Sequence, residues 1–255
     1  MPDRPAESPG EKLTDITRQG ENPTTAPPAI QRHRTVLLWV MAASALIVFS
    51  LLSFLVETRP SFPIDLRITL AIQSIHSPFF EGLMRVISWP GFSPQSILIT
   101  LLVAFTLYIY RLRWESVTAL LGALLSGVIN ELVKGLIARP RPLAEVVDVF
   151  AVLDSYSFPS GHVMFYITLF GFVWYVIFTV LKRSLLRNFL LGLLGAFILL
   201  VGVSRIYLGQ HWASDVLGAY LLGGLVLAGT ILFYQWGKKR FFVYQSHSPF
   251  GVSKN

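Results

Sequence analysis

The stretch NFLLGLLGAFILLVGVSRIY, residues 188–207, decides the fold class of this chain. It is apolar almost throughout, and Arg205 near its end is its one charged side chain. An α-helix needs about 20 residues to cross the roughly 30 Å hydrocarbon core of a bilayer. The stretch therefore predicts a membrane-spanning helix.

Other segments of the chain have the same length and apolar character. They are Thr35–Val56, Pro94–Leu112, Glu115–Ala138, His162–Leu181 and Asp215–Trp236. With Asn188–Tyr207 they predict an all-α, polytopic membrane bundle of six transmembrane helices. The stretch Ile64–Ile87 is also apolar, but it carries several charges and a break at Ser77-Pro78, so we expect an interfacial, amphipathic element there.

The composition of the chain excludes an ordinary soluble enzyme. Hydrophobic residues make up 53% of its 255 residues and charged residues 14%, against about 25% charged in a typical soluble domain. The absence of cysteine excludes a disulfide framework, a thiolate nucleophile and a zinc–thiolate site. The net charge of +7 comes from basic residues that mostly flank apolar segments, which favours membrane orientation over nucleic-acid binding.

The distribution of basic and polar residues predicts the domain organisation. Residues 1–30 hold six of the 15 prolines and no aromatic residue, which is typical of a disordered tail. We expect a six-helix membrane domain over residues 31–240 and a short C-terminal tail over 241–255. The basic residues on one side of the predicted membrane are Arg32, Arg34, Arg111, Arg113, Lys182, Arg183, Arg187, Lys238, Lys239 and Arg240. By the positive-inside rule, both tails are cytoplasmic in a plasma or inner membrane.

Three polar motifs lie at the ends of the predicted helices. They read KGLIARPRP over residues 134–142, SFPSGH over 157–162 and SRIYLGQHWASD over 204–215. With six spans and a cytoplasmic N-terminus, spans three and five end on the outer side, and spans four and six begin there. The topology therefore brings all three motifs to one depth on the extracytoplasmic side, and spans three to six form the catalytic core.

The first group of residues in these motifs suits a phosphate group. Lys134, Arg141 and Arg205 supply three positive charges, and the two guanidinium groups match phosphate oxygens. Ser160 and Gly161 open a helix, where free N–H groups and the helix dipole attract an anion. Three unpaired cations near a membrane are unfavourable, so we expect an anion to bind among them.

The second group suits phosphoryl transfer. His211 and Asp215 are four residues apart and share one helix face, so the carboxylate can orient the imidazole as a nucleophile. His162 lies beside the anion site and can protonate a departing oxygen. Because the sequence shows no carboxylate cluster for a metal ion, the three cations are expected to neutralise the phosphoryl oxygens, with no metal or other cofactor.

Together, these motifs resemble the three signatures of the type-2 phosphatidic acid phosphatase superfamily, which read Lys-x6-Arg-Pro, Pro-Ser-Gly-His and Ser-Arg-x5-His-x3-Asp. The resemblance covers roughly residues 117–223, and no signature position departs from it. It implies phosphate binding by Lys134, Arg141, Ser160, Gly161 and Arg205. It also implies that His162 is the proton donor, His211 the nucleophile that forms a phosphohistidine, and Asp215 its partner.

The resemblance also implies a membrane-embedded lipid phosphatase or diphosphatase. The substrate classes it suggests are prenyl diphosphates such as undecaprenyl diphosphate, phosphatidylglycerophosphate and phosphatidic acid. Two other functions stay open at this stage. The same phosphohistidine could pass its phosphoryl group to another lipid, which would make the protein a phosphotransferase. The cation cluster could also belong to an anion transporter or a phospholipid-binding membrane protein.

Some polar residues have a second interpretation. Lys134 could pair with Glu131, three residues earlier on the same predicted helix, and serve structure alone. Arg139 is a candidate loop or headgroup contact rather than a signature residue. The remaining histidines, His33, His76 and His247, show no partner pattern, so we expect them to be solvated or interfacial. The loop 143–156 could select headgroups or control entry.

Overall fold

A computed structural model describes residues 28–59 and 62–242 of the chain. The predicted tails, 1–30 and 241–255, lie almost entirely outside these residues, as does His247. The described residues divide into two compact parts, 28–44 and 45–242. The contacts discussed below all lie within the second part, which also holds the three polar motifs.

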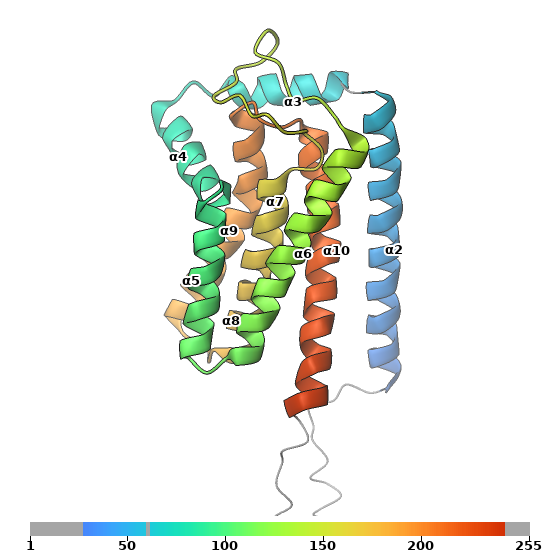
Figure 1. Ribbon diagram of the computed structural model, residues 1–255, viewed down its shortest axis with the longest axis vertical. Helices are drawn as coiled ribbons and strands as arrows, with labels where there is room; N and C mark the ends of the chain where they lie inside the picture. Colours follow the sequence, from blue (N-terminus) through green and yellow to red (C-terminus); the bar gives the residue numbers. More distant parts are fainter. Residues whose placement is uncertain (1–27, 60–61, 243–255) are drawn as a thin grey trace, which may run out of the picture. The chain divides into compact units, whose positions relative to one another are not determined.

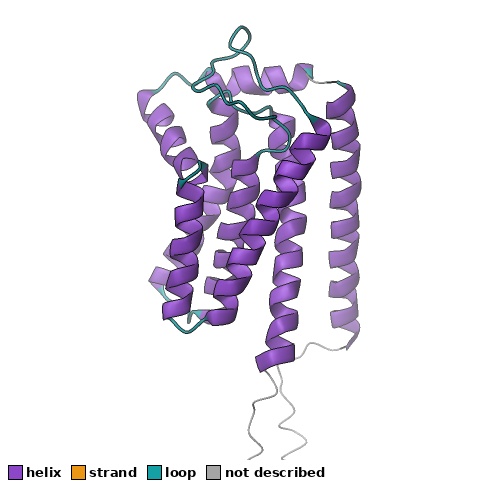
Figure 2. Ribbon diagram, viewed as in Figure 1, coloured by secondary structure: helices purple, strands orange, loops and turns teal. Residues whose placement is uncertain are grey.

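Every regular element in the described residues is helical, as the composition predicts (Figure 2). The α-helices are α2 (Pro28–Thr58), α3 (Pro63–Gln73), α4 (Pro78–Ser88), α5 (Gln95–Ile109), α6 (Arg113–Ile137), α7 (Gly161–Phe165), α8 (Gly171–Val180), α9 (Leu185–Tyr207) and α10 (Ala213–Gly237). A short 3-10 turn, Trp89–Gly91, follows α4, and a π-helical turn, Tyr166–Phe170, joins α7 to α8 in one continuous helix. A second π-helical turn, Lys238–Phe242, follows α10.

The helices match the predicted spans with one difference. Five helices in the described residues are long and apolar enough to cross a membrane, over Thr35–Thr58, Arg113–Ile137, Gly161–Val180, Leu185–Tyr207 and Ala213–Phe241. The predicted span Pro94–Leu112 is instead the 15-residue helix α5, which is short for a span. With Pro78–Gly91 it forms a helix pair bent by 65°, so the described residues hold five spans, or six when this pair is counted as one span.

Prolines explain the breaks around the bent span. A proline has no backbone N–H and clashes with the preceding helical turn, so helices end before it or begin at it. Helix α4 begins at Pro78, where the sequence predicts a break, and Pro90 and Pro94 flank the bend before α5. Helix α3 contacts α9 and α10, and in Figure 1 it crosses their ends. The region 64–87 therefore holds two short helices, with the break where the sequence predicts it.

The predicted catalytic core is a set of closely packed helices. Helix α10 contacts α6, the α7–α8 helix and α9, and the buried side chains Phe158, Met164 and Ala219 lie among these elements. Gly202 of α9 allows a close approach to α10, because a Cβ there would lie 2.7 Å from Val216 of α10. Small residues at helix crossings are the usual means of close packing in membranes.

We expect Gly202→Ala to destabilise the fold and Gly195→Ala to leave it intact. Both glycines lie in α9, so both substitutions gain helix propensity, but a Cβ at Gly195 meets nothing within 4 Å. Overpacking at Gly202 should lower the free energy of unfolding by about 1–3 kcal/mol. Thermal unfolding in detergent measures both variants, and equal midpoints would contradict the packing described for α9 and α10.

Candidate active site

Four helix ends meet at one end of the bundle and bring the three motifs together. Helices α6 and α9 end there at Ile137 and Tyr207, and α7 and α10 begin there at Gly161 and Ala213 (Figure 1, upper part). This is the convergence that alternating spans predict.

Arg205 is the most deeply buried of the predicted phosphate ligands. Its side chain is fully enclosed, and its Nη1 donates to Oγ of Ser88 at 2.5 Å. Its Nε and Nη2 have no hydrogen-bond partner among the described residues. Buried donors without partners are rare because each loses its hydration without replacement. An anion with several acceptor oxygens would satisfy them.

Ser160 and Gly161 add a second set of donors at the start of α7. The hydroxyl of Ser160 is buried and also has no partner in the part of the chain that the structure describes. A Cβ at Gly161 would lie 3.0 Å from Oδ1 of Asn130 and 3.7 Å from Nζ of Lys134. The absence of a side chain at Gly161 therefore leaves space between the helix N-terminus and the ammonium group.

Lys134 belongs to the same cluster and also makes the alternative contact expected from sequence. Its Nζ lies 3.2 Å from Oε1 of Glu131, whose side chain is 71% exposed. Solvent weakens an ion pair with such an exposed carboxylate. Lys134 itself is buried on the polar stripe of α6 that includes Ser126 and Asn130. The ammonium group can therefore contact Glu131 and still face an anion at Gly161.

Arg141 faces the ring of His211. The loop holds its guanidinium, because Nε donates to the carbonyl of Ser155 at 2.7 Å and Nη1 to the carbonyl of Gln210 at 2.6 Å. From this position Nη1 lies 3.3 Å from Nε2 of His211. A cation at this distance can contact an anionic group that lies against Nε2 of His211.

His211 is held as a neutral ring with Nε2 toward the cations. Its Nδ1 lies 2.8 Å from the backbone carbonyl of Ser157, which accepts the Nδ1 proton. Burial, reinforced by the positive charges of Arg141, Arg205 and Lys134, holds the pKa of His211 well below its ordinary value. The lone pair of Nε2 is therefore available at neutral pH.

Asp215 acts on His211 less directly than the sequence predicts. Its Oδ2 is 3.6 Å from Nδ1 of His211, so the carbonyl of Ser157 and not the carboxylate is the nearer acceptor. The same Oδ2 accepts hydrogen bonds from the hydroxyl of Ser157 and from the backbone N–H of Trp212. The carboxylate thus fixes the residue that orients His211 and places a negative charge close to the ring.

His162 follows Gly161 in α7 and packs against an aromatic ring. Its ring packs edge-on against Phe92, with centroids 4.5 Å apart, and a Cβ at Gly91 would lie 2.3 Å from ring atom Cδ2. Its Nε2 is buried without a hydrogen-bond partner among the described residues. The guanidinium carbon of Arg205 also lies over the ring of Phe92, 5.2 Å from the centroid of that ring. One aromatic ring therefore positions two of the predicted site residues.

Arg139 is buried in the protein, whereas the sequence predicts a loop or headgroup contact. It is 1% exposed, and its Nη1 donates to Oδ1 of Asp215 and its Nη2 to Oδ2 of Asp65, the latter at 2.8 Å. A guanidinium so enclosed cannot reach a lipid headgroup. The structure therefore replaces the expected headgroup contact with a buried pairing between α3 and α10.

Sequence reasoning missed several residues that support the site. They are Asp65, Ser88, Gly91, Phe92 and the carbonyl of Ser157. The described part of the chain contains no group of three or more His, Cys, Asp and Glu side chains arranged to hold a metal ion. His33 and His76 are exposed and lie outside the cluster.

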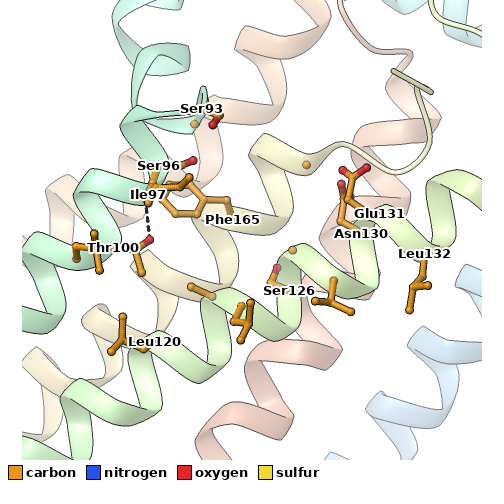
Figure 3. A pocket seen from close by; sticks show the side chains of 17 residues that line it. Ser93, Ser96, Ile97, Thr100, Leu120, Ser126, Asn130, Glu131, Leu132 and Phe165 are labelled. Atoms are coloured by element: carbon orange, nitrogen blue, oxygen red, sulfur yellow. Dashed lines mark hydrogen bonds between the residues drawn. The ribbon is translucent and has the colours of Figure 1, made fainter. Parts of the chain in front are cut away.

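An apolar groove leads to the cluster from the side of the bundle. It has a volume of about 990 Å³ and reaches Asn130 and Gly161 beside the donors described above. Figure 3 shows α5 side chains such as Ile97 on one side of the groove and α6 side chains such as Ser126 on the other. The site is therefore open to an elongated apolar group.

Comparison with known proteins agrees with this fold. The model of the PAP2 superfamily matches residues 115–240. Phosphatidylglycerophosphatase B of Bacillus subtilis is 29% identical over 185 residues, which cover 72% of this chain and 89% of that protein. The undecaprenyl-diphosphatase of Sulfolobus acidocaldarius is 32% identical over 149 residues, 57% of this chain and 66% of that protein.

A solved structure shares the fold. The crystal structure of the transmembrane PAP2 type phosphatidylglycerolphosphate phosphatase from Bacillus subtilis superposes with a TM-score of 0.67 at 26% identity, over 76% of this chain and 96% of that one. Helical spans and relatives that are named phosphatases define a membrane phosphatase. The chain belongs to the PAP2 superfamily, among its membrane lipid phosphatases.

We expect Gly91→Ala to reduce phosphatase activity about tenfold or more, because the new methyl group would displace the ring of His162. Gly82→Ala is the matched control, since a Cβ at Gly82 in α4 meets nothing within 4 Å. Phosphate release in detergent measures both variants. If the two substitutions had equal effects, the contact between Gly91 and His162 would be irrelevant to activity.

Proposed function

We propose that this protein hydrolyses a phosphate monoester or diphosphate on a membrane lipid through a phosphohistidine, without a metal ion. One observation carries the proposal. The neutral ring of His211 directs Nε2 toward Arg141, within a cluster that also contains unpaired buried donors of Ser160, His162 and Arg205. A nucleophile beside cations and donors that suit phosphate oxygens is the arrangement that phosphoryl transfer requires.

In the first step, Nε2 of His211 attacks phosphorus and the bond to the leaving oxygen breaks. Arg141, Arg205 and Lys134 neutralise the phosphoryl oxygens, which takes the place of a metal ion. His162 gives its proton to the leaving oxygen. The phosphorylated ring carries a positive charge, which the carboxylate of Asp215 and the carbonyl of Ser157 stabilise.

In the second step, water attacks the phosphohistidine. His162, now without its proton, accepts a proton from that water, and the bond between phosphorus and Nε2 breaks. Inorganic phosphate leaves, and His211 returns to its neutral form while His162 is again protonated. The two steps consume one water and use the same general acid and base in reverse order.

The substrate class follows from the groove and from the relatives. The groove between α5 and α6 can hold an acyl or prenyl chain while the headgroup lies at Gly161. The named relatives act on phosphatidylglycerophosphate and undecaprenyl diphosphate. We therefore propose these lipids and phosphatidic acid as substrates, with the site on the extracytoplasmic side and both termini in the cytoplasm, as the basic residues predict.

We expect His211→Ala to lower phosphate release about a thousandfold or more, because no nucleophile remains. His76→Ala is the matched control, since His76 is exposed and outside the cluster. Release is measured in detergent from phosphatidylglycerophosphate, undecaprenyl diphosphate and phosphatidic acid, with a chelator present. Near-normal activity of His211→Ala would disprove the mechanism, and complete inhibition by the chelator would disprove metal independence. Label from the donor in a second lipid, in place of free phosphate, would favour the phosphotransferase.

We expect Leu124→Trp to raise the KM for a long-chain lipid about tenfold, because the larger ring would fill the groove. The KM for a short-chain, water-soluble phosphate ester should not change. Leu125→Trp is the control, since Leu125 is exposed on α6 outside the groove lining. Equal changes for both substrates would place the lipid tail elsewhere.

A further inference from the structure

The catalytic carboxylate Asp215 belongs to a buried charged network that extends beyond the three motifs. Arg139 bridges Asp215 of α10 and Asp65 of α3. Asp65 is 1% exposed, and Asp215 and the Arg139 side chain are fully buried. Such a network is unfavourable unless each of its charges is paired and hydrogen-bonded.

The hydrogen bonds of the network suit two carboxylates that act only as acceptors. Oδ1 of Asp65 accepts from the backbone N–H of Ser214 at 2.8 Å, and Oδ2 accepts from the hydroxyl of Ser214 at 2.6 Å and from Arg139. That hydroxyl in turn accepts from Nη1 of Arg139 at 2.7 Å. Asp215 accepts from Arg139, Ser157 and Trp212. Each of these hydrogen bonds reaches the carboxylates from a group that can donate, as expected for acceptor-only groups.

The charge balance of this network matters for the nucleophile. Two carboxylates and one guanidinium leave one net negative charge next to His211. If Asp65 were neutral, Arg139 would cancel the charge of Asp215 completely. The ring of His211 becomes positive when it is phosphorylated, and it then lies among three further cations. Net negative charge in the network is therefore required at the step in which the ring gains charge.

We infer that Asp65, on a helix outside the signature motifs, is a positioning residue. Its carboxylate shares the positive charge of Arg139, so that Arg139 does not cancel the negative charge of Asp215. The inference rests on the proposed phosphohistidine mechanism. Asp65 contacts neither the predicted phosphate ligands nor the ring of His211, so it acts through Arg139 and Asp215. It therefore affects the chemical step and leaves substrate binding unchanged.

We expect Asp65→Asn to lower kcat about thirtyfold and to leave KM within about twofold of the wild-type value. The amide keeps the shape of the carboxylate and an acceptor for the N–H of Ser214, but it removes the charge. The double variant Asp65→Asn/Arg139→Gln restores one net negative charge, so we expect its kcat to recover to within about tenfold of wild type. Glu81→Gln is the control, since Glu81 forms an exposed pair with Arg85 on α4.

The recovery distinguishes charge from packing. A merely structural role predicts that the double variant is worse than the single one, and that result would overturn the inference. A fall of less than threefold in Asp65→Asn would also overturn it. If Asp65→Asn does not fold, the double variant decides, and a loss of more than tenfold overturns the inference.

The same assay separates this inference from the proposed function. If the wild-type protein releases no phosphate from any lipid, or if His211→Ala stays active, the proposed function fails and the inference fails with it. If both behave as proposed and Asp65→Asn matches wild type, the inference alone fails.

Discussion

The pairing of one buried guanidinium with two carboxylates is the interaction on which the site depends. Arg139 lies in the loop after α6, Asp65 in α3 and Asp215 in α10, so the pairing joins three segments that are far apart in sequence. An unpaired charge at this depth is unfavourable by several kcal/mol, which forces the three segments together. Asp215 also accepts a hydrogen bond from the hydroxyl of Ser157, whose carbonyl orients the ring of His211, the proposed nucleophile. A shift of α3 would therefore move the groups that orient the ring of His211.

A second group of polar side chains next to this network is left unpaired. Oγ of Ser160, Nε2 of His162, and Nε and Nη2 of Arg205 have no hydrogen-bond partner among the described residues, whereas the oxygens of Asp65 and Asp215 all accept hydrogen bonds. The contrast has a physical meaning, because donors that are held in place before the ligand arrives need no rearrangement when charge develops in the transition state. The hydrogen-bonded carboxylate network thus holds the neighbouring donors in place for a ligand.

The fold was predictable from sequence because each span is a local property of about 20 residues. The meeting of Lys134, His162 and His211 was predictable as well, since alternating spans bring their helix ends to one side. Asp65 was not, because its partners lie about 75 and 150 residues away and its neighbours suggest an interfacial element. The burial of Arg139 was not predictable either, because its partners Asp65 and Asp215 lie 74 and 76 residues away in sequence. Long-range pairing of single charges leaves no periodic signal in one sequence.

Different parts of the chain supply the predicted phosphate site and the groove beside it. Residues 115–240, which match the family, hold every predicted ligand, nucleophile and acid. The preceding part supplies one wall of the groove through α5, the ring of Phe92 against His162, and the charge of Asp65. A water-soluble ester would need the phosphate cluster alone, whereas a lipid also needs a lateral opening. The bend between α4 and the short helix α5 lies at that opening, so this part of the chain links phosphate chemistry to a substrate that stays in the bilayer.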